Sequence, residues 1–404
     1  MSAGTDGAIP IIPTSARPRL ESIDLLRGII IVLMALDHVR DYFSHDLLSF
    51  FPLDLEKTYP AIFLTRWITN FCAPTFCFLA GTSAFLSFRR GKTKNDLARF
   101  LVSRGLWLVL LELTVIRCLG WSFNFDYRVT GVQVIWALGW SMVALAGLIY
   151  LPRWLIATIA AAMIAGHNLA DAIQPAAFGT FGWLWTILHV PGPIALSPRF
   201  TLLVLYPLIP WIGVMAFGYL FGAVFQSETQ VRRRQLLWWG VGMTVAFIAV
   251  RATKLYGDPH QWHAQRDALF TVFDFIKCQK YPPSLLFLLM TLGPAIALLA
   301  LFDRASGKWR RPLIVIGRVP LFFYMLHIPL IHGLAIALAY AKHGRAEWLL
   351  DAPWGEAPQP PQDYGYSLAG VYLIWILVVI ALYPGCAWFA ALKQRKRDPW
   401  LSYL

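Results

Sequence analysis

Long apolar runs separated by short polar segments dominate the chain. A helix that crosses a membrane needs about 20 mostly apolar residues, and the sequence contains ten runs of roughly that length. They cover residues 23–43, 61–88, 98–118, 129–151, 153–172, 200–225, 236–255, 282–302, 312–340 and 367–391. The pattern predicts an all-α, polytopic membrane protein with about ten transmembrane helices. We expect a transmembrane domain at 21–392, between a flexible cytoplasmic tail at 1–20 and a basic cytoplasmic tail at 393–404.

The composition excludes a water-soluble globular enzyme. Of the 404 residues, 58% are hydrophobic and 14% are charged, whereas a soluble domain is about 45–50% apolar and roughly 25% charged. A single soluble core cannot bury this much apolar surface. The same composition excludes a disordered or collagen-like chain.

The basic residues indicate the topology. Lys and Arg number 35 against 22 acidic residues, and they gather at the ends of the apolar runs. If the N-terminus is inside, 19 of them fall in cytoplasmic segments and 9 in outer loops. The positive-inside rule therefore predicts an N-in, C-in protein, and the net charge of +13 needs no nucleic-acid partner. The four longest connections (44–60, 173–199, 256–281 and 341–366) all lie outside, where we expect the distinctive ligand.

Neither the cysteines nor the loop histidines indicate a metal centre. The five cysteines form no CxxC motif, and four of them lie in or beside apolar runs, so we expect small membrane-embedded residues. His260 and His263, with Asp258, have one-turn spacing, but their loop contains no third ligand motif. We therefore expect no metal.

The run at 23–43 carries the densest set of ionisable residues. Such residues are costly inside a membrane and are functional candidates by default. Spacings of three and four place four of them on one helical stripe, namely Asp24, Arg27, His38 and Asp41. Arg27 and His38 are eleven positions apart, which is about three turns or roughly 16 Å, and Arg27 is nearer the cytoplasm. The alternative is helix packing, in which Asp24 pairs with Arg27 and His38 bonds to a neighbour.

Polar residues in three later segments extend the set of candidates. They are Arg66 and Asn70 in the second run, Lys280 and Tyr281 just before the eighth, and Arg318, His327 and His332 in the ninth. Asn70 lies near the predicted depth of His38 and could orient the imidazole or a substrate. For His327 and His332 the alternative is a buried structural histidine.

Five stretches, in their order along the chain, carry a family resemblance. They are SIDLLRGIIIVLMALDHVRDYF, RWITNFCAPTFCFLAGTSAFL, YPLIPWIGVMAFGYLFG, KYPPSLLFLLMTLGP and GRVPLFFYMLHIPLIH. Together they resemble the heparan-alpha-glucosaminide N-acetyltransferase catalytic-domain family, in its bacterial branch. Arg27, ten intervening residues and His38 also resemble the Arg-to-His motif of bacterial membrane acyltransferases that modify surface sugars.

The resemblance implies an integral protein of the bacterial cytoplasmic (inner) membrane. Its expected activity is the transfer of an acyl group, with acetyl expected, from cytoplasmic acyl-CoA to a sugar or glycan on the outer side. Arg27 matches the donor side and His38 the chemistry. In the eukaryotic enzyme an Asn takes the first-span His position and the functional His lies in the following lumenal segment, so His45 is the alternative.

The expected mechanism assigns a role to each donor-side and catalytic candidate. Asp24, Arg27 and Arg318 would bind acyl-CoA. His38 would act as a general base or form a transient acyl-imidazole. The other catalytic candidates are Asp37 or Asp41, which would fix the tautomer of His38, Asn70, which would stabilise the oxyanion, and His327.

Candidates for binding the acceptor are His45, Arg66, Lys280, Tyr281 and His332. The expected partners are membrane lipids, acyl-CoA and the outer acceptor, while the sequence leaves a homodimer open. The alternative function is a transporter or a lipid or glycan exporter without covalent chemistry. Two equal inverted halves, which are typical of transporters, are not evident.

Overall fold

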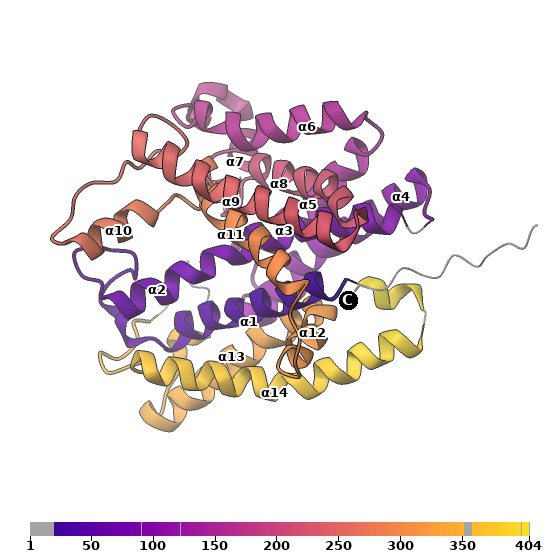
Figure 1. The fold of residues 1–404 in the computed structure, drawn as a ribbon. Coiled ribbons are helices and arrows are strands. Elements are labelled where there is room, and N and C mark those ends of the chain that lie inside the picture. Colours follow the sequence, from indigo (N-terminus) through magenta and orange to yellow (C-terminus); the bar gives the residue numbers. More distant parts are fainter. Residues whose placement is uncertain (1–19, 90, 122, 351–357, 397, 404) are drawn as a thin grey trace, which may run out of the picture.

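A computed structural model describes residues 20–89, 91–121, 123–350, 358–396 and 398–403. Apart from Leu20, the predicted tail at 1–20 lies outside the described residues. The chain folds mostly into helices (Figure 1). The helices are α1 (Glu21–Phe43), α2 (Pro60–Ile68), α3 (Cys72–Phe88), α4 (Lys94–Leu111), α5 (Val134–Leu148), α6 (Arg153–Ala161), α7 (Gly182–Leu188), α8 (Leu208–Phe221), α9 (Thr229–Thr253), α10 (Ala268–Ile276), α11 (Leu285–Phe302), α12 (Arg310–Arg318), α13 (Pro320–His343) and α14 (Leu368–Arg395).

Six helical segments of the described chain are long and apolar enough to cross a membrane. They are Pro60–Phe88, Leu208–Gln226, Thr229–Thr253, Leu285–Phe302, Pro320–His343 and Leu368–Arg395. A pair bent by 110°, Arg153–Ala170 and Pro175–Leu188, makes a seventh if it counts as one span. Helix α1 forms where the first apolar run predicts it but carries more charged residues than any of the six. The count of about ten transmembrane helices stays a prediction, and so does the N-in, C-in orientation.

The chain is not entirely helical, because it contains a small three-stranded sheet. Strands β1 (Val129–Val132), β2 (Gly192–Ser197) and β3 (Phe200–Val204) lie in the order β1–β3–β2. Strand β1 runs parallel to β3, with Val129 opposite Thr201, and β2 runs antiparallel to β3. The apolar runs predicted as helices at 129–151 and 200–225 therefore begin as strands. A short apolar run fits strand and helix equally well, and Pro207 disfavours helical backbone at the residue before it.

Helix α1 runs through the middle of the bundle, between α3 on one side and α13 and α14 on the other (Figure 1). Two glycines let α12 approach it at backbone contact distance. A Cβ atom on Gly28 would lie 1.9 Å from the Leu313 carbonyl oxygen, and one on Gly317 would lie 1.8 Å from the Asp24 carbonyl oxygen. Small residues permit such close helix packing in membranes. The contact brings Arg318, at the end of α12, beside the first turn of α1.

Candidate functional site

Two buried histidines meet near the centre of the bundle, one from α1 and one from α13. His38 Nδ1 lies 2.8 Å from His327 Nε2, and the two rings are stacked with their centroids 4.9 Å apart. On its other side His327 Nδ1 lies 2.8 Å from the Tyr324 carbonyl oxygen and 3.2 Å from that of Phe323. Helical spacing explains these last contacts, because a side chain in a helix lies over the preceding turn.

The hydrogen bonds fix the tautomers of this pair when both rings are neutral. A carbonyl oxygen only accepts, so His327 Nδ1 must carry the proton that it donates to Tyr324. His327 Nε2 is then the acceptor, and His38 Nδ1 must be the donor. His38 Nε2 is therefore left with a lone pair, and within the described residues it has no hydrogen-bond partner. A neutral imidazole held in one tautomer by a second group is suited to accept a proton.

A partly open cavity of about 330 Å³ lies along the first half of α1. Successive turns of α1 line it with Arg27, Ile31 and Met34, and His38 is the next position of that stripe. Tyr324 also lines the cavity, and its ring centroid lies 6.5 Å from that of His38 and 5.3 Å from that of His327. The predicted stripe on the first helix thus lines the cavity over about two turns, from Arg27 to Met34. Neither histidine lines it, and Tyr324 is the residue that the cavity wall and the surroundings of the pair share.

Four basic side chains from four helices line the same cavity. They are Arg27 of α1, Arg104 of α4, Arg318 of α12 and Lys393 of α14. No acidic side chain of the described residues lines it. Pockets for small molecules have volumes of about 300–1,000 Å³, so this one can enclose a slender ligand. Its basic residues suit an anionic one.

Contacts with neighbouring residues hold Arg27 and Arg318 in the cavity wall. Arg27 donates to the Leu79 carbonyl oxygen at 3.2 Å and to the Ser83 hydroxyl. The buried carboxylate of Asp24 lies 3.6 Å from Arg27 and 3.8 Å from Arg318. The structure thus brings together the three residues predicted for the donor side, although the Asp24–Arg27 contact is also what the helix-packing alternative predicts.

Asp37 and Asp41 contact arginines and not His38. Arg40 lies 2.7 Å from a carboxylate oxygen of Asp37 and 2.6 Å from one of Asp41. Asp37 also accepts a hydrogen bond from Thr69 at 2.8 Å and lies 3.7 Å from Arg66. The residue in hydrogen-bond contact with His38 is His327, so the contacts do not supply the expected carboxylate partner of His38.

The remaining predicted residues form their hydrogen bonds and ring contacts with groups other than His38 and His327. Asn70 accepts a hydrogen bond from Arg66 at 3.2 Å. His45 bonds to the Tyr364 carbonyl oxygen at 2.8 Å, and His332 to that of Leu349 at 2.6 Å. The Tyr281 hydroxyl lies 3.4 Å from that of Tyr206, and the Lys280 ammonium lies 5.2 Å from the Tyr281 ring.

Sequence reasoning missed three residues of the cavity wall and one buried acid. Arg104, Tyr324 and Lys393 line the cavity, and Arg104 could have been noticed as a charge within an apolar run. Glu112 is buried and accepts a hydrogen bond from the Gln133 backbone at the start of α5. A carboxylate stabilises a helix N-terminus, so Glu112 has a structural role that its place in an apolar run did not reveal.

Comparison with known proteins gives one match. Residues 19–256 match the family described as heparan-alpha-glucosaminide N-acetyltransferase, catalytic. The match covers more than half of the chain and includes α1, which supplies Arg27 and His38, and α4, which supplies Arg104. No curated protein matches the chain.

Proposed function

Because the chain belongs to the heparan-alpha-glucosaminide N-acetyltransferase catalytic family, we propose that it transfers an acetyl group from cytoplasmic acetyl-CoA to a sugar on the other side of the membrane. The observation that carries the proposal is the basic cavity along α1, because Tyr324 in its wall also neighbours both rings of the His38–His327 pair. Membership of a family of membrane acetyltransferases supports the reaction class. The donor, the direction of transfer and the acceptor are our proposals.

The donor enters by the basic end of the cavity. Arginine side chains bind phosphate oxygens through paired N–H groups, and Arg27, Arg104 and Arg318 lie in the wall together with Lys393. The narrow acyl-carrying arm of acetyl-CoA would pass Ile31 and Met34, which line the cavity between these residues and the histidine pair. The phosphates would stay at the basic end, which the positive-inside rule predicts to face the cytoplasm.

His38 then acts as the general base. Its Nε2 lone pair takes the proton from an acceptor hydroxyl or amine while that oxygen or nitrogen attacks the thioester carbon. The carbon–sulfur bond breaks, and the leaving thiolate takes the proton back from His38. His327 is a positioning residue, because its Nε2 accepts from His38 Nδ1 and keeps the basic lone pair on the other nitrogen. A well-placed general base contributes about 10²–10⁴-fold to a rate.

The acceptor would bind at the outer end of α1. Arg66 lies close to Asp37 there, and Lys280 and Tyr281 are partly exposed on the segment before α11. Charged groups beside an aromatic ring suit a sugar, which offers both hydroxyls and an apolar ring face. His45 and His332 already bond to backbone carbonyls, and acceptor binding by them stays a prediction.

Single-turnover transfer by the purified full-length protein tests this proposal, with acetyl-CoA as the donor and a panel of amino sugars as acceptors. We expect His38→Ala to lower the rate by about 10²–10⁴-fold while acetyl-CoA still binds and the thermal stability is retained. His327→Ala should have an intermediate effect. His327→Gln, which offers an oxygen near the position of Nε2, should recover part of the loss. His45→Ala should have the smallest effect.

Two outcomes would contradict the proposal. Loss of transfer in His45→Ala with normal transfer in His38→Ala would assign the chemistry to the loop histidine. If all three alanine variants transfer at the wild-type rate, the histidine mechanism fails, and uptake or export assays in vesicles become the next measurement for the transporter alternative.

A further inference from the structure

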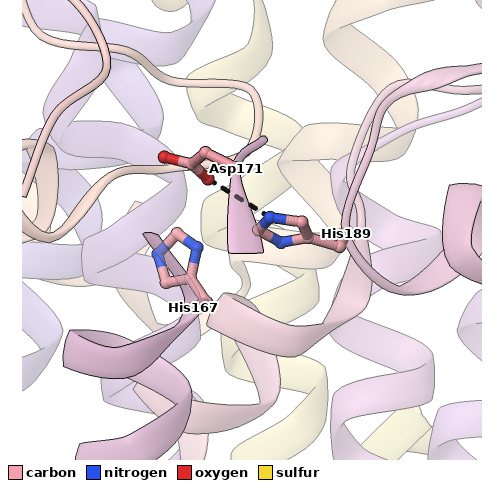
Figure 2. A group of neighbouring side chains, drawn as sticks. All are labelled: His167, Asp171 and His189. Atoms are coloured by element: carbon pink, nitrogen blue, oxygen red, sulfur yellow. Dashed lines mark ion pairs between the residues drawn. The ribbon is translucent and has the colours of Figure 1, made fainter. Parts of the chain in front are cut away.

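A second group of histidines lies at the break of the bent helical pair. His167 begins the short helical turn His167–Ala170, Asp171 follows that turn, and His189 comes directly after α7. Figure 2 shows the three side chains pointing toward one another. One ligand atom from each lies within 4.8 Å of the others, and Asp171 Oδ1 is 3.2 Å from His189 Nε2.

An ion pair between Asp171 and His189 Nε2 gives partners to the carboxylate and to one ring nitrogen, but not to the other three ring nitrogens of the group. His167 is 5% exposed, and neither of its ring nitrogens has a partner of good hydrogen-bond geometry, although the Pro283 carbonyl is near. His189 is 1% exposed, and its Nδ1 has no partner in the described chain. A buried polar atom without a hydrogen bond is costly. Two histidines with such atoms and a carboxylate between them point to a ligand.

We propose that His167, Asp171 and His189 bind a zinc-like divalent cation. Two imidazoles and one carboxylate are a zinc ligand set that leaves the fourth position for water. With bonds of about 2.0–2.2 Å, ligand atoms of a tetrahedral zinc site lie roughly 3.3–3.6 Å apart. Asp171 and His189 are already near that separation. The cluster as a whole, whose atoms span up to 4.8 Å, needs to contract by roughly 1 Å.

Asn168 provides the second shell that a metal-bound carboxylate needs. Its Nδ2 donates to Asp171 Oδ2 at 2.8 Å, which leaves Oδ1 for the cation. Its Oδ1 accepts from the Leu285 backbone N–H at 2.9 Å, at the first residue of α11. The cation would therefore hold the two halves of the bent pair together and fix them to the start of α11. The site is independent of the acetyl transfer proposed above.

Cobalt titration of the full-length protein tests this site. The protein is purified in detergent without a histidine tag and treated with a chelator, and Co²⁺ is added while its visible absorption is recorded. We expect one Co²⁺ per chain, displaced by Zn²⁺. Because loss of a second-shell partner alone costs about 10–100-fold in metal affinity, His167→Ala and His189→Ala should weaken binding by more than about 100-fold.

The matched control is His263→Ala, which removes an exposed histidine from the loop before α10 and should leave the affinity unchanged. His167→Phe keeps the buried volume and serves where His167→Ala does not fold. The proposal is wrong if the wild-type protein binds no stoichiometric Co²⁺, or if either His167 variant binds it as tightly as the wild type. Neither result bears on acetyl transfer, since no step of the measurement uses acetyl-CoA.

Discussion

The two ends of α1 hold their charges in different ways. At the C-terminal end Arg40 contacts Asp37 and Asp41, and Arg66 lies 3.7 Å from Asp37, so two acids and two bases face one another. At the N-terminal end the buried Asp24 lies between Arg27 and Arg318. These two arginines line a cavity together with Arg104 and Lys393.

The difference shows that charged residues in a membrane helix can have two roles, one in holding helices together and one in binding a ligand. Acids and bases that neutralise one another within contact distance hold helices together, and removing one partner leaves the other charge without its counter-ion. Basic groups around a cavity without acidic lining residues are positioned to bind an anion from outside the protein. Substitutions at the C-terminal end of α1 should therefore affect folding, and those at its N-terminal end should affect ligand binding.

The largest effect is expected for Arg40→Met. This change removes the buried Arg40 guanidinium and leaves Asp37 and Asp41 without their closest cation. Breaking a fully buried ion pair costs about 3–5 kcal/mol, and the Asp37 and Asp41 side chains are 16% and 35% exposed. We therefore expect the free energy of unfolding to fall by about 3 kcal/mol, at the lower end of that range, measured by thermal or denaturant unfolding in detergent. The matched control is Arg27→Met on the same helix, which leaves Asp24 beside Arg318 and should destabilise the protein less. Equal losses in the two variants would remove the distinction between the two ends.

A smaller effect, on ligand binding, is expected for Arg27→Ala. Hydrogen bonds to charged groups contribute about 1.5–3 kcal/mol, so the Kd for acetyl-CoA should rise roughly 10- to 100-fold. Calorimetry at constant ionic strength measures this change. Arg27→Lys should restore part of the affinity, because an ammonium keeps the charge and loses the planar pair of donors. An unchanged Kd in Arg27→Ala would return Arg27 to helix packing.

The smallest effect is expected for Ser83→Ala. The Ser83 hydroxyl accepts from Arg27, so its loss should weaken the positioning of the guanidinium by about 0.5–1.5 kcal/mol. The Kd for acetyl-CoA should rise a few-fold, without a change in unfolding. Ser87→Ala is the control, since Ser87 lines the same cavity one turn further along α3 and no hydrogen bond joins it to Arg27 within the described chain. Equal shifts in both variants would show that the effect comes from the cavity surface and not from Arg27.

The sequence predicts which residues share one face of α1 better than it predicts what those residues contact. Spacing of three and four predicts that Asp24, Arg27, His38 and Asp41 share one face, and α1 is helical over all four positions, because helical periodicity alone determines which residues share a face. It could not identify the partner of His38. Adjacent residues on a helix point about 100° apart, so Asp37 turns away from His38 toward arginines, and the actual partner lies 289 positions further along the chain.

Two other features depend on the same kind of long-range contact. Strand β1 pairs with β3 across some seventy residues, and a four-residue apolar run does not reveal whether it will find such a neighbour. His167 and Asp171 stand one turn apart in the sequence, but His189 joins them only because the chain bends between the two halves of the pair. In the sequence, His260 and His263 have a spacing typical of metal ligands, but because their loop lacks a third ligand motif the sequence predicts no metal.

The hydrogen bonds of His327 limit where a proton can travel. Both groups that accept from its Nδ1 are main-chain carbonyls of α13, and such oxygens do not take up a proton at ordinary pH. A proton received by His38 therefore has no onward path through its partner and must leave from the nitrogen at which it arrived. The imidazole pair therefore holds a proton but does not pass it on to another group. In the proposed transfer that proton goes from the acceptor to the leaving thiolate in exchange for the acetyl group, so no net charge crosses the membrane and the membrane potential would not drive the reaction.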